Sequence, residues 1–170
     1  MAHRVIGALV LVVALARGVC VAHAAAQAVD KFSHEGWAGE AVIQDGKFRQ
    51  CNMWASAINN WDLGFALEAT GELRLGLRNQ KIDMGWTMLF GQNTSARIQI
   101  DQGPVLTKAF TTVTPKLVST SLKDTDWEKR LPDGKLLRVN TGSRVRLFHL
   151  NGIKQAMAML RACVAKHRSA

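Results

Sequence analysis

The sequence lacks the residue patterns on which most enzymes depend. It contains no tyrosine and no glycine-rich loop that could hold a phosphate, and none of its serines stands in a nucleophile-elbow pattern. The histidines at 34, 149 and 167 are scattered and show no metal-ligand spacing with the cysteines. We therefore expect a non-enzymatic protein without catalytic residues, metal or cofactor. The alternative is a small periplasmic hydrolase or an enzyme accessory protein, with His149 as its candidate base.

A long apolar run is also missing. Residues 5–16 are apolar, but Arg17 ends the run short of the roughly 20 residues that a membrane-spanning helix needs. Arg4 before this run and the small residues Ala22 and Ala24 after it are typical of a secretory signal peptide. We expect a signal peptide over residues 1–24, with residue 26 as its latest end, and no stable transmembrane anchor. The protein would then be exported to the bacterial periplasm, or be secreted or associated with the envelope.

Acidic residues are few. The chain has 22 Lys and Arg against 13 Asp and Glu, a formal net charge of +9. Removal of residues 1–24 takes away two arginines and no acid, which leaves 20 against 13, or +7. This balance favours an anionic partner. Nucleic acid is not expected, because export would separate the protein from it.

Only two of the three cysteines, Cys51 and Cys163, remain in the mature chain. In an oxidising compartment an isolated pair of this kind predicts a disulfide. A bridge that closes a loop of over 100 residues would stabilise the fold by roughly 4 to 5 kcal/mol in the chain-entropy model. Two separately buried free thiols are the alternative.

Short alternating runs separated by turn residues predict an antiparallel β-sheet domain. Asp45 and Gly46 form a turn signal between two such runs, and Leu73, Leu75 and Leu77 alternate with polar residues as in a half-buried strand. The strands that we expect cover residues 37–43, 47–54, 61–69, 72–77, 84–90, 98–100, 110–119, 136–139 and 143–149.

Two helices complete the expected fold. Trp127 and Leu131 lie four residues apart before Pro132, which predicts a short helix near 125–131. Apolar residues at helical spacing predict a C-terminal helix near 152–166. No linker divides the chain, so we expect a flexible N-terminal approach over 25–36 and a single mainly β domain, a sandwich or a curved sheet, over 37–168.

Several motifs resemble those of a known family. They are the opening with Trp37 and Cys51, then IDQGP at 100–104, LPDGKLLRV at 131–139, and FHLNG at 148–152 before the last helix. Together they resemble the small exported bacterial proteins of the invasion-associated locus B type over nearly the whole mature chain. The resemblance implies a β-rich periplasmic or envelope protein with a non-enzymatic role, which in some members is tied to host-cell contact.

Two sets of side chains are candidates for partner binding. Arg74, Arg78, Arg144 and Arg146 alternate with apolar residues on two expected strands, which predicts a solvent-facing surface for an anionic envelope component. Trp54 and Trp61 bracket a loop where both could contact a protein partner. The alternatives are a merely solvated basic face and core tryptophans. A structural assembly subunit is a third class, which a large exposed apolar patch would indicate.

Overall fold

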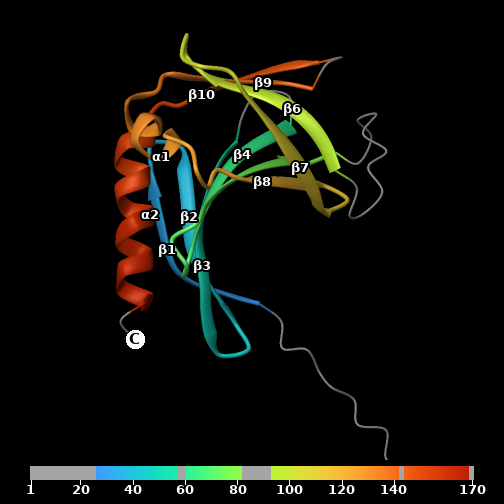
Figure 1. Cartoon of the computed structure of the whole chain (residues 1–170). Coiled ribbons are helices and arrows are strands. Elements are labelled where there is room, and N and C mark those ends of the chain that lie inside the picture. The colour runs from blue at the N-terminus through green and yellow to red at the C-terminus, as the bar shows by residue number, and fades with distance from the viewer. Residues whose placement is uncertain (1–25, 57–59, 82–92, 142–143, 169–170) are drawn as a thin grey trace, which may run out of the picture.

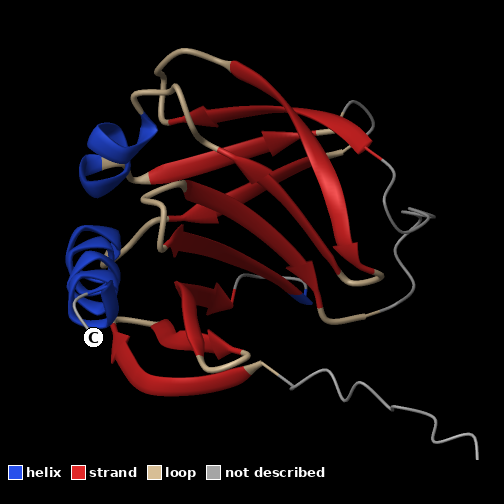
Figure 2. Cartoon of the chain, turned by 60° about the horizontal axis from the view of Figure 1, so that its bottom comes forward, coloured by secondary structure: helices blue, strands red, loops and turns tan. Residues whose placement is uncertain are grey.

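The computed structural model describes residues 26–56, 60–81, 93–141 and 144–168, which form one curved antiparallel sheet with its helices on one side (Figures 1 and 2). The strands are β1 (Gln27–His34), β2 (Trp37–Gln44), β3 (Lys47–Ser56), β4 (Trp61–Glu68), β5 (Leu73–Asn79), β6 (Asn93–Ile100), β7 (Leu106–Thr114), β8 (Leu117–Ser121), β9 (Leu136–Asn140) and β10 (Val145–His149). Their order in the sheet is β1-β2-β3-β4-β5-β8-β7-β6-β9-β10. The expected mainly β, curved-sheet fold is confirmed.

The helices also confirm the prediction. α1 (Trp127–Arg130) continues into the 3-10 helix η2 (Leu131–Asp133), and the C-terminal helix α2 spans Ile153–Arg168. Trp127 and Leu131 are completely buried, so this short helical segment is anchored in the core by the two residues that predicted it. Among the described residues, no helix is long and apolar enough to cross a membrane.

The core lies on one face of the sheet, which we call the inner face. On β4 and β5 the buried apolar residues stand opposite one another, as in the pairs Phe65 with Leu75 and Leu63 with Leu77. α2 packs on the inner face of β1 to β4 through a buried stripe that includes Met157 and Leu160. Burial of such side chains contributes about 1.5 to 3 kcal/mol each.

Curvature brings strands that are distant in the sheet close together. Five strands separate β4 from β10 in the sheet order, yet the guanidinium carbon of Arg146 on β10 lies 5.6 Å from the ring centroid of Trp61 on β4. Inner-face residues of β6, β9 and β10, such as Ile98, Leu137 and Phe148, therefore join the same core. The opposite, outer face of the sheet is where side chains can meet a partner.

Two expectations about the strands are wrong. The segment 25–36 is not a flexible approach, because residues 27–34 form β1 and pair with β2. The expected single strand over 110–119 is two strands, β7 and β8, joined by a turn at Pro115 and Lys116. The β-branched run concealed this turn, although proline has no N–H to donate to a strand pair and favours turns. The signal peptide and the expected strand over 84–90 lie outside the described residues.

Candidate functional site

The two arginines of β5 point to the outer face, as predicted, but each is paired with acid. Arg78 donates from Nε to Oδ2 of Asp62 at 2.7 Å, and Gln80 donates to Oδ1 of the same carboxylate at 2.8 Å. Asp62 is completely buried. A buried carboxylate needs such partners, since its desolvation would otherwise be costly. Arg78 therefore compensates the charge of Asp62 through its Nε, while the rest of its side chain is 46% exposed.

Arg74 is held in the same way. Its guanidinium lies 3.1 Å from Glu72 and 3.6 Å from Glu68, and it donates to the hydroxyl of Ser119 on β8 at 3.2 Å. Two arginines thus face three carboxylates on this part of the outer face. The charge of Arg74 and Arg78 is thus compensated within the sheet, and their role as an anion-binding surface stays a prediction.

Arg146 and Arg144 do not join them. Phe148 is 2% exposed, whereas Val145 and Leu147 are 49% and 52% exposed, so β10 has the opposite phase from the one expected. Arg146 therefore shares the inner face with Phe148 and packs over the Trp61 ring. Arg144 is exposed just before β10. Arg74 and Arg78 thus lie on the outer face and Arg146 on the inner face, so the structure does not bring the predicted set together.

The two tryptophans of the predicted contact loop are divided as well. Trp61 is 4% exposed and belongs to the core. Trp54 lies on the outer face, where the guanidinium carbon of Arg78 is 4.8 Å from its ring centroid. A β-carbon at Gly64 or Gly76 would collide with the Trp54 indole, so these glycines let the ring lie across β4 and β5. The expected paired aromatic loop is therefore wrong.

A different basic surface lies on β6, β9 and β10. It consists of Arg97, Arg138, Val145 and Leu147, all exposed on the outer face, and we call it the outer patch. The strand register sets Leu147 directly opposite Arg138, and it sets Asn140 opposite both Arg97 and Val145. Arg97 and Arg138 are thus diagonal neighbours on adjacent strands, within reach of one ligand.

In the described part of the chain, no carboxylate forms an ion pair with Arg97 or Arg138. None of the residues in β6, β9 and β10 is Asp or Glu. The nearest acid that follows β6, Asp101, accepts hydrogen bonds from the backbone N–H groups of Lys135 and Leu136. Sequence reasoning did not select Arg97 and Arg138. The absence of acids from residues 93–100, 136–140 and 145–149 is the signal that could have identified them.

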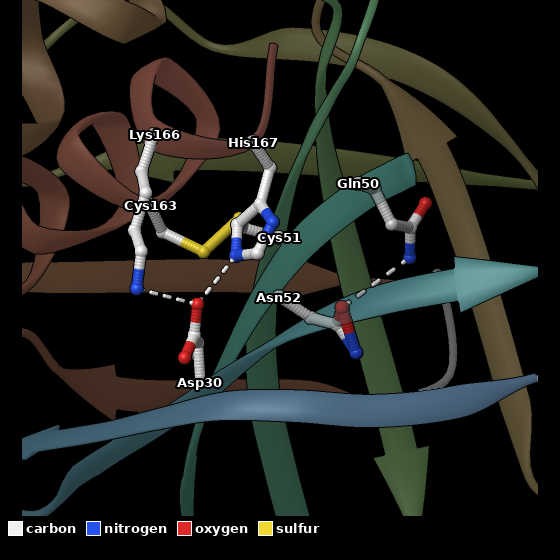
Figure 3. Close-up of a disulfide and its surroundings, with 7 residues drawn as sticks. All are labelled: Asp30, Gln50, Cys51, Asn52, Cys163, Lys166 and His167. Atoms are coloured by element: carbon white, nitrogen blue, oxygen red, sulfur yellow. Dashed lines mark hydrogen bonds and ion pairs between the residues drawn. A yellow bond between two sulfur atoms is a disulfide. The ribbon is translucent and has the colours of Figure 1, made fainter. Parts of the chain in front are cut away.

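The disulfide between Cys51 on β3 and Cys163 on α2 is formed, as predicted, across 112 residues (Figure 3). Beside it, Lys166 Nζ and His167 Nε2 both lie 2.7 Å from Oδ2 of Asp30 on β1. The hydrogen bond from Lys166 is the largest cause that lowers the pKa of the Asp30 carboxyl; desolvation opposes it, and the charge of Lys166 and the contact with His167 lower the pKa further. This cluster attaches β1 to the end of α2.

A metal centre has no basis in the described part of the chain. There, no three His, Cys, Asp or Glu side chains gather closely enough to hold a metal ion. His149 is exposed on the outer face of β10, opposite Leu136.

Fold and surfaces together define a mainly β domain with one open curved sheet, one disulfide and a basic patch on strands that contain no Asp or Glu. No family model, curated protein or solved structure matches this chain. The resemblance to invasion-associated locus B proteins therefore stays a prediction.

Proposed function

We propose that the protein is an exported, non-enzymatic binding protein that attaches to an anionic lipid surface of the bacterial envelope through the outer patch. The observation that carries the proposal is the pair of exposed arginines, Arg97 and Arg138, on strands that contain no carboxylate. Both side chains lack an ion pair with any of the described residues. They can therefore donate to an external phosphate without first losing an internal partner.

The chemistry of the patch suits a phosphate-bearing lipid better than a purely polar anion. Arginine presents planar N–H donors that match phosphate oxygens in a bidentate fashion. Val145 and Leu147, about half exposed beside these donors, supply apolar area that would be buried at the boundary between head groups and acyl chains. The arginines would thus contact the phosphate groups, while the neighbouring apolar side chains would contact the acyl chains.

The magnitude of the effect can be estimated. An arginine near an anionic lipid surface contributes about 1 kcal/mol to attachment. Replacement of Arg97 and Arg138 by Gln should therefore weaken binding by about 2 kcal/mol, or about thirtyfold.

The test is co-sedimentation of the purified protein with vesicles of phosphatidylglycerol and phosphatidylethanolamine, against vesicles of phosphatidylethanolamine and phosphatidylcholine. We expect binding to the anionic vesicles only, weaker at high salt because screening reduces the attraction. The Arg97→Gln, Arg138→Gln variant should lose it. The matched control is Lys123→Gln with Lys129→Gln, which removes two exposed charges elsewhere and should retain at least most of the binding.

Two results would contradict the proposal. Equal binding to neutral vesicles would show that charge is not the determinant, and equal losses in the two double variants would show that only net charge matters. Export itself is tested separately by the mass of the protein recovered from a periplasmic fraction, where a chain beginning near residue 25 is expected.

A further inference from the structure

A groove crosses the outer face of β3, β4, β5, β7 and β8, and none of the residues of the outer patch lines it. Its volume is about 310 Å³, near the lower end of the range for small-molecule sites. In Figure 3, Gln50 and Asn52 of β3 project from the side opposite the Cys51–Cys163 disulfide. The groove therefore lies on the side of β3 away from the disulfide and α2, and we call it the Trp54 groove.

The Trp54 indole lies over Gly64 on β4 and Gly76 on β5 and forms one apolar surface of the groove. Ala66 on β4 lines the groove as well, and Leu117 and Val113 supply further apolar walls. The Trp54 indole is fixed in place, because the two glycines lie beneath it and the Arg78 guanidinium packs against its ring. A wall that is already ordered loses little conformational entropy when a ligand binds.

The polar groups of the groove can both donate and accept hydrogen bonds. Gln50 donates to Asn52 at 3.5 Å, a single bond that leaves both amides with further donor and acceptor capacity. Ser119 accepts from Arg74 at 3.2 Å, so its own O–H can still donate into the groove. Groups with this double capacity match the hydroxyls of a polyol, each of which also donates and accepts.

Charge in the groove is already compensated. Its arginine, Arg74, is paired with Glu68, which also lines the groove, and with Glu72 beside it. An anion would meet these carboxylates, and a cation would have to compete with the guanidinium. A neutral ligand avoids both penalties.

We propose that the Trp54 groove binds one or two rings of a neutral oligosaccharide, such as the terminal units of a neutral envelope glycan. The apolar walls would contact the C–H faces of the ring, and Gln50, Asn52 and Ser119 would bond to its hydroxyls. This site is independent of the outer patch and of the proposed lipid attachment.

The experiment is a titration of the ¹⁵N-labelled protein, followed by NMR, with a panel of neutral trisaccharides built from glucose, mannose, galactose and N-acetylglucosamine. The signals to follow are the side-chain amides of Gln50 and Asn52 and the indole N–H of Trp54, which Trp54→Phe assigns. We expect at least one member of the panel to shift these signals in a saturable manner.

Two variants make the test specific. Ala66→Leu places a larger side chain in the groove without entering the core and should weaken sugar binding at least about tenfold; Ser119→Ala removes one hydroxyl and should weaken it less. The Arg97→Gln, Arg138→Gln variant should bind the sugar as well as the wild type does. The proposal is overturned if no trisaccharide shifts the groove signals, if Ala66→Leu binds normally while folded, or if a fatty acid occupies the groove and the sugars do not.

Discussion

Two regions of the outer face of this sheet carry arginines in opposite environments. On β5, Arg74 and Arg78 are bound to carboxylates, and one of these, Asp62, is buried. On β6 and β9, Arg97 and Arg138 stand exposed in strands without any Asp or Glu. Each guanidinium on β5 therefore has a carboxylate beside it that compensates its charge, whereas no carboxylate of the described residues pairs with Arg97 or Arg138.

The difference shows that solvent-facing position alone does not identify a binding arginine. Arg74 and Arg78 alternate with buried leucines as clearly as any arginines in the chain. What determines their role is the acid content of the neighbouring strands, and β4 supplies Asp62 and Glu68. We therefore propose the outer patch as the binding surface, whereas the charges around Arg74 and Arg78 compensate one another within the sheet.

The largest expected effect is the loss of stability on removal of the disulfide. This bridge joins β3 to α2 in the half of the sheet that carries the groove. Replacement of both Cys51 and Cys163 by Ala should lower the free energy of unfolding by about 4 kcal/mol, because the open chain gains the entropy of a loop over 100 residues long. Denaturant titration measures this loss. Vesicle binding by the still-folded variant should be unchanged, and two titratable thiols in the native wild type would refute the bridge.

A smaller effect on the free energy of unfolding is expected when one charged residue is replaced beside β5 or in the outer patch. Asp62→Ala removes two hydrogen bonds to a buried carboxylate and should lower the free energy of unfolding by about 1 to 3 kcal/mol, discounted because Arg78 is 46% exposed and can be hydrated. Arg138→Ala should change it by less than about 0.5 kcal/mol, as for an exposed side chain without a partner. Thermal or denaturant unfolding of the two variants gives both numbers, and equal losses would remove the distinction between the regions.

The smallest effect concerns pH and the exposed cluster of Asp30, Lys166 and His167. The pKa of Asp30 is lowered from its ordinary value of 3.8 in the folded state, chiefly by the Lys166 hydrogen bond. Its contribution to stability is therefore present above pH 3.8 and is lost as the pH falls through the lower, folded pKa. The unfolding midpoints of the wild type and Asp30→Asn should differ slightly at pH 6 and converge below pH 3.8. A difference that persists undiminished at the lowest pH would contradict this assignment.

The periodicity of apolar residues predicted most of the fold. On β4, β5 and α2 these residues are confined to the face that packs on the core. The periodicity failed on β10, where apolar residues occur on both faces and Phe148 decides which one is buried. β1 was not expected because only Val29 and Phe32 are apolar enough to mark it, and it is an edge strand held by β2 and α2.

The site was harder to predict than the fold. Trp61 and Arg146 meet only because the sheet curves back on itself, and a local pattern contains no information about such a contact. The pairing of Arg78 with Asp62 likewise depends on β4 and β5 being neighbours in one register. The disulfide was predictable without geometry, since an oxidising compartment leaves two cysteines few alternatives.

The most direct measurement of the central claim compares Arg74→Gln with Arg138→Gln in their affinity for the same anionic vesicles. Each substitution removes one outer-face arginine, so the change in net charge is identical. The account predicts that Arg138→Gln weakens binding by about 1 kcal/mol, or about fivefold, while Arg74→Gln leaves it within experimental error. A loss with Arg74→Gln equal to or larger than that with Arg138→Gln would contradict it.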